Sequence, residues 1–150
     1  MTAHVRQQIQ EQFVRNCANL TTTSTRVFKS RVYDMDQTEV PALCIYANSE
    51  ASARATMQTT ASLERTLDVI VEGYVQENLA SEMDDTMDTI AAEVEVAIAS
   101  DPTCNGLAKD TVLTSTELTM TGEGDLPGGM VRMTWTVLYF TKTTAPTVAL

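Results

Sequence analysis

The chain has 150 residues, of which 43% are hydrophobic, and a formal net charge of −10. This length fits one domain that is large enough to bury a core. No apolar run reaches the roughly 18 residues of a membrane span, and so acidic a chain is poorly suited to gripping nucleic-acid phosphates. The N-terminus lacks the apolar segment of a signal peptide, and the three cysteines have no metal-ligand spacing, so we expect a protein made and kept in a cytoplasm.

The charge is unevenly distributed along the chain. Residues 1–33 carry five bases against one acid, whereas residues 34–101 carry fifteen acids against two bases. This asymmetry permits a basic face of one copy to meet an acidic face of the next. The alternative is that the acids only keep the protein in solution.

Two amphipathic helices are predicted. In residues 4–20, apolar side chains recur every three or four positions, and a run of threonines then ends the helix. Residues 80–100 have the same period, and Pro102 and Gly106 follow the last turn. The apolar stripe of the second helix is a core face: Met83, Met87, Ile90, Val94 and Ile98.

Strands are predicted between these helices. Residues 62–77 alternate apolar and polar side chains over a long stretch, which is typical of a strand with one buried face. Residues 25–33 and 40–46 are expected to be shorter strands. Residues 47–61 are small and polar, which favours a long loop, and loops of this length are often functional.

The C-terminal part is predicted to be a β-hairpin. Residues 111–121 and 131–143 both alternate, and a glycine-rich turn at 122–129 separates them. In the first of these strands, the alternation assigns one face to Val112, Thr114, Thr116, Leu118 and Met120. Residues 144–150 contain Pro146 and have no evident partner, so we expect a flexible arm after a single domain of residues 1–143.

This order of elements predicts an α+β fold, with a mixed or antiparallel sheet of about five strands and two helices packed on one face. The chain offers little for catalysis. His4 is the only histidine, and the glycine-rich turn joins two strands where a phosphate-binding loop would lead into a helix. We therefore expect no enzymatic activity and no cofactor. A remote alternative is a small metal-dependent enzyme that uses Asp84, Asp85 and Asp88, although acids at a helix start are more simply explained by the helix dipole.

Several segments carry a resemblance to a known family. An amphipathic first helix precedes T-R-V-F-K-S-R at 25–31, V-P-A-L-C-I-Y at 40–46 and R-T-L-D-V-I-V-E at 65–72, and an acidic helix and a closing hairpin follow. In this order the chain resembles the tail terminator proteins of long-tailed bacteriophages, the minor tail protein U type, over about residues 5–143.

The resemblance implies a virion structural protein. Such a protein forms a homohexameric ring on the head-proximal end of the tail, stops polymerisation of the tail tube protein, and offers a surface to the head-side connector (stopper) protein. DNA would pass through the lumen without specific binding, no membrane would be involved, and assembly would take place in the host cytoplasm. The alternative role is that of a head–tail connector or another tail-completion subunit.

Charge and exposure, rather than the resemblance, suggest contact residues. For the subunit interface we expect basic side chains of one copy, Arg26, Lys29 and Arg31, to meet acidic side chains of the next, Glu64, Asp68 and Glu72. For contact with the tube or connector we expect Arg54 and Asp125. An ordinary solvated surface is the alternative for all of them.

Overall fold

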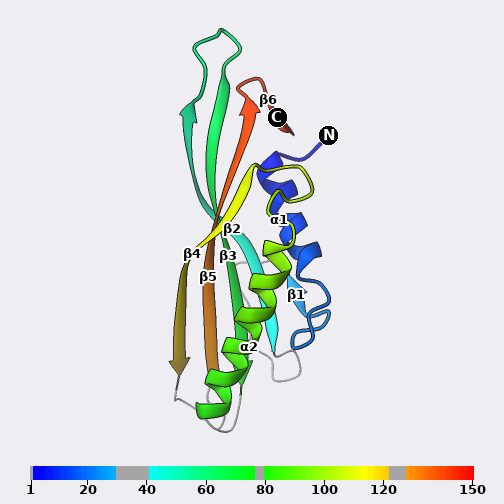
Figure 1. Ribbon diagram of the computed structural model, residues 1–150, viewed down its shortest axis with the longest axis vertical. Helices are drawn as coiled ribbons and strands as arrows, with labels where there is room; N and C mark the ends of the chain where they lie inside the picture. The colour runs from blue at the N-terminus through cyan, green and yellow to red at the C-terminus, as the bar shows by residue number, and fades with distance from the viewer. Residues whose placement is uncertain (1, 30–40, 77–79, 122–127) are drawn as a thin grey trace.

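A six-stranded sheet runs the length of the molecule in the computed structural model, which describes residues 2–29, 41–76, 80–121 and 128–150 (Figure 1). The strand order is β1-β2-β3-β5-β4, and β6 also pairs with β5. The pairing of β1 with β2 is parallel, and all the other pairings are antiparallel. The elements in chain order are α1 (Val5–Asn16), β1 (Val27–Phe28), β2 (Ala42–Arg54), β3 (Ser62–Gln76), α2 (Ala80–Ala99), β4 (Asp110–Thr121), β5 (Gly128–Lys142) and β6 (Ala145–Ala149).

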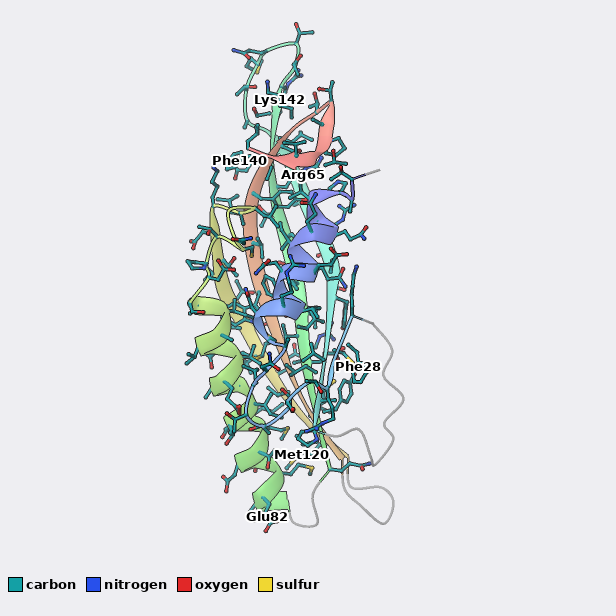
Figure 2. All side chains as sticks on the ribbon, turned by 90° about the vertical axis from the view of Figure 1, so that its right-hand side faces the viewer. Phe28, Arg65, Glu82, Met120, Phe140 and Lys142 are labelled. Carbon is teal, nitrogen blue, oxygen red and sulfur yellow. The ribbon has the colours of Figure 1, made fainter. Side chains whose placement is uncertain are left out.

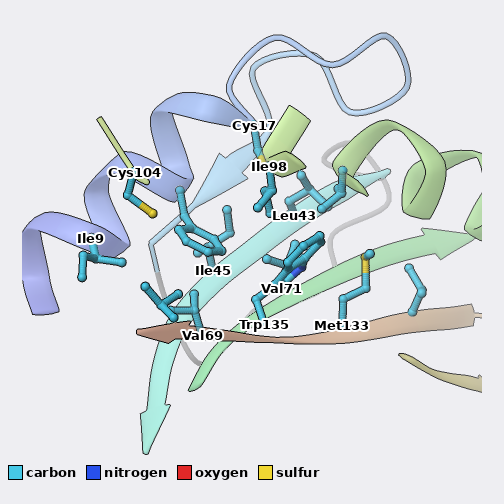
Figure 3. Packing of buried hydrophobic residues seen from close by; sticks show 14 of the residues in the cluster. Ile9, Cys17, Leu43, Ile45, Val69, Val71, Ile98, Cys104, Met133 and Trp135 are labelled. Atoms are coloured by element: carbon cyan, nitrogen blue, oxygen red, sulfur yellow. The ribbon is translucent and has the colours of Figure 1, made fainter. Parts of the chain in front are cut away.

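Both helices lie on the same face of the sheet, as predicted (Figure 1). The predicted stripe of α2 is buried, with no member more than 1% exposed. These side chains meet the alternating residues of β3 and β5 in one core, shown in part in Figure 3. The α+β class and the mixed sheet are therefore confirmed, with six strands in place of about five.

The central strand pair depends on a glycine under α2. A Cβ on Gly73 of β3 would lie 2.9 Å from side-chain carbons of both Ile90 and Val131. Gly129 of β5 has a similar position beneath Met83 and Met87, whose nearest atoms would lie 3.0 to 3.2 Å from an added Cβ. The close approach of helix and sheet thus leaves no room for a side chain at Gly73, whereas an added carbon at Gly129 would have to displace flexible methionine side chains.

The predicted loop at 47–61 is wrong for its first half. Strand β2 continues to Arg54 and pairs with β3 as far as Arg54↔Leu63, so only residues 55–61 connect the two strands. Polar and small residues from 48 to 54 gave no alternation to detect, because most of them are exposed. Backbone pairing with β3 holds them extended.

Two further expectations are corrected at the sheet edges. Residues 144–150 are not a free arm, because β6 pairs with the end of β5 that extends past β4. In β4, a register shift between Leu113 and Ser115 reverses the alternation. Val112 therefore faces away from the helices, whereas Leu118 shares the helix-side face with its partner Val131.

Candidate interaction surfaces

The β2–β3 hairpin projects beyond the helices at one end of the molecule (Figure 1). Every residue from 51 to 60 is exposed. The tip is held by side chains: the Arg54 guanidinium donates to the carbonyl oxygens of Thr56 and Gln58, both at 3.1 Å. The hydroxyl of Thr56 accepts the Ser62 N–H at 3.0 Å. The exposed tip is therefore a braced turn.

A buried charge network lies at the base of this hairpin, on the helix side of the sheet. The Glu50 carboxylate, whose side chain is 8% exposed, accepts hydrogen bonds from Arg6 at 2.7 Å and Arg65 at 3.0 Å, and from the Tyr139 hydroxyl. Arg65, 11% exposed, also donates to the Thr141 hydroxyl at 3.0 Å (Figure 2 labels Arg65). Charge-assisted bonds of this kind join α1, β2, β3 and β5 where the hairpin leaves the body.

Burial and neighbouring charges alter titration at this network. Burial, followed by the hydrogen bond to Glu50, raises the pKa of Tyr139. Burial and then the charges of Arg6 and Arg65 lower the pKa of His4. His4 also caps α1, because its Nδ1 accepts the Arg6 N–H at 3.0 Å. A neutral imidazole is the form that makes this bond.

The helix α2 presents an acidic outer surface. It carries six acids and no base. The alternative hypothesis of a metal-dependent enzyme depended on three of these acids, Asp84, Asp85 and Asp88. All three side chains are exposed. Within the described ranges, no group of three His, Cys, Asp or Glu residues is placed to hold a metal ion.

Two of the three predicted basic contacts, Arg26 and Lys29, are already engaged within the chain. Arg26 donates to the carbonyl oxygens of Pro41 at 2.7 Å and Thr22 at 3.1 Å. Lys29 forms an exposed ion pair with Glu11 at 3.1 Å. Arg31 lies outside the described residues, as does Asp125.

The predicted acidic contacts share the sheet face opposite the helices but differ in exposure. Glu64 is exposed. Asp68 is half-buried and accepts hydrogen bonds from the hydroxyls of Ser49 at 3.3 Å and Thr136 at 3.1 Å. Glu72 is only 5% exposed, on a stretch of β3 that is buried on both faces. Of the three, Glu64 has the exposure that a contact between copies needs.

An apolar pocket lies between the segment after α1 and the side of α2. It has a volume of about 450 Å³. Its lining is Asn19, Leu20, Thr21, Ala92, Glu93, Val96 and Ala97. Sequence reasoning missed this pocket and the Glu50 network, since each joins segments that are distant in the chain. The one signal in the sequence was that Val96 is apolar but lies outside the predicted core stripe of α2. In the structure its side chain is 72% exposed.

No helix in the described part of the chain combines the length and apolar character needed to cross a membrane. No protein-family model matches the chain, and no curated protein matches it. Among solved structures, a chain from the virion of a native gene transfer agent particle is similar over 90% of this chain and 92% of that chain, with 15% sequence identity and a TM-score of 0.44. Similarity of this degree assigns no function.

Proposed function

We propose that this chain is a structural protein of a phage-like virion that acts as the tail terminator. In this role, copies assemble into a ring, which we propose is a homohexamer, on the head-proximal end of the tail tube. The ring ends tube growth and presents a surface to the head-side connector. No reaction is involved, so the protein acts through its shape and its surfaces.

The observation that carries the proposal is the braced β2–β3 hairpin extending past the helix layer. A braced exposed arm gives each copy a means of reaching a neighbour at a reduced ordering cost. A contact between two different surfaces of the same chain is heterologous and generates a ring when the rotation closes. The order of helices and strands also agrees with the order on which the resemblance to tail terminators was based.

The charge of α2 is consistent with the same role. Five of its six acids are exposed, the sixth, Glu93, is half-buried, and the helix carries no base. A wall of this charge repels phosphates and lets DNA pass without binding. We propose that part of this surface faces the lumen of the ring.

The decisive experiment adds the purified chain to the polymerising tail tube protein of the same virus. Tube lengths are then measured by negative-stain electron microscopy. We expect shorter tubes as the ratio of this chain to tube protein rises, with rings visible at tube ends. An unchanged length distribution at a tenfold molar excess would reject the terminator role.

Position in the particle separates the terminator from the alternative connector role. A gold label on residue 150 is expected at the junction between tube and connector in complete particles, and on the ends of tails that lack heads. A label that stays with heads when tails are absent would favour the connector.

A further inference from the structure

The hairpin tip presents an apolar side chain to solvent. Met57 is 92% exposed, the highest value among the exposed large hydrophobic residues described. Arg54 bonds the carbonyl oxygens on either side of it, at Thr56 and Gln58. These bonds hold the backbone on either side of the exposed methionine, and an unbranched thioether side chain fits irregular apolar surfaces well.

The apolar pocket beside α2 has the properties of a receptor for such a side chain. Its volume of about 450 Å³ lies within the range of sites that bury small ligands, so it has room for a methionine. Val96 and Ala92 are exposed at its rim, on the side of α2 that faces away from the core. Leu20, which packs partly against the core, closes the other side.

Charge matches the tip to the pocket. Arg54 is the only charged residue between Glu50 and Glu64, and in the described part of the chain no carboxylate forms an ion pair with it. The pocket wall contains Glu93, whose carboxylate accepts bonds from the Thr22 N–H and hydroxyl but has no basic partner among the residues described. The positive charge of Arg54 at the hairpin tip therefore complements the negative charge of Glu93 in the pocket wall.

The tip cannot fill the pocket of its own chain. Figure 1 shows the hairpin pointing away from the body beyond the start of α1, whereas the pocket lies where α1 has ended, beside the later turns of α2. We infer that the hairpin tip of one copy inserts Met57 into the apolar pocket beside α2 of a second copy, with Arg54 facing Glu93. This contact deepens the proposed function, on which it rests for the assembly of identical copies, by naming the two surfaces that join them.

Crosslinking between two differently substituted proteins tests this contact. Protein carrying M57C is mixed with protein carrying V96C at about 1 mM total, where even a millimolar affinity populates the complex. The matched control replaces V96C by V112C, because Val112 is also exposed but lies on β4, facing away from the helices. We expect at least ten times more disulfide-linked dimer with V96C than with V112C, and equal yields would overturn the inference.

A second measurement uses assembly itself. M57D should lower the association constant measured by light scattering at least tenfold, because it places a carboxylate in an apolar pocket beside Glu93, whereas M57L should preserve association. If the unsubstituted chain and M57D shorten tubes and form rings equally, the inference is wrong and the terminator role stands. If the M57C–V96C crosslink forms but neither the unsubstituted chain nor any variant changes tube length, the copies join as inferred and the terminator role fails.

Discussion

Replacing Glu50 by alanine tests whether the network at the hairpin base is a buried charge pair. The carboxylate accepts three side-chain hydrogen bonds, and its two closest buried partners are Arg65 and Tyr139. E50A leaves the Arg65 guanidinium, 11% exposed, without a carboxylate. Loss of one partner from a fully buried pair costs about 3–5 kcal/mol, so we expect about 2–4 kcal/mol here, given the small access to solvent.

The assay is urea unfolding followed by tryptophan fluorescence, since Trp135 is buried in the core and is the only tryptophan. R6A is the matched control because Arg6 contacts the same carboxylate but is 41% exposed, and it should cost about 0–1 kcal/mol. The double variant E50L/R65M removes both buried charges together, and we expect it to be more stable than E50A. The reasoning fails if E50A and R6A differ by less than about 0.5 kcal/mol.

Three other perturbations follow from the structure. G73A should lower the free energy of unfolding by about 1–3 kcal/mol, because the added carbon meets branched side chains. G129A should cost less, because the methionine side chains above Gly129 are flexible, and urea titrations of the two variants measure the difference. The lowered pKa of His4 means that the folded chain binds fewer protons than the unfolded chain just below pH 6.5, so the free energy of unfolding should fall as the pH drops through that window. H4N should keep the helix cap and abolish the contribution of His4 to this pH dependence. An unchanged pH dependence in H4N would refute the assignment of this effect to His4. Burial raises the pKa of the Cys17 and Cys44 thiols to about 12 and that of the Cys104 thiol to about 11. Ellman's reagent at pH 8 should therefore label all three cysteines far more slowly in the native chain than in the unfolded chain.

Elements with one buried face could be located from residue order alone. The period of the α2 stripe reports burial on one side, and the alternation in β3 picks out the residues that face the core, although residues 69–73 of β3 are buried on both faces. The hairpin of β4 and β5 was recognised for the same reason, because β5 alternates between core and half-buried positions along most of its length. The fold class followed from the order of these segments.

The missed features depend on partners that are distant in the chain. The outer half of β2 has no apolar pattern, and only its pairing with β3 makes it a strand. Strand β6 forms because β5 extends past the end of its pairing with β4, which leaves an edge of β5 to which β6 pairs. Likewise, Glu50 had no sign in the sequence that distinguished it from other acids until Arg6 and Arg65 were placed beside it.

Residue order thus determined which segments are helices and strands wherever a core covers one face, because hydrophobic periodicity is a local record of burial. Tertiary structure alone decided which polar segments are extended, which charges are buried together, and where the exposed Met57 and the pocket beside Val96 lie relative to each other. Those properties arise from pairing and packing between segments far apart in the chain, which no local pattern encodes.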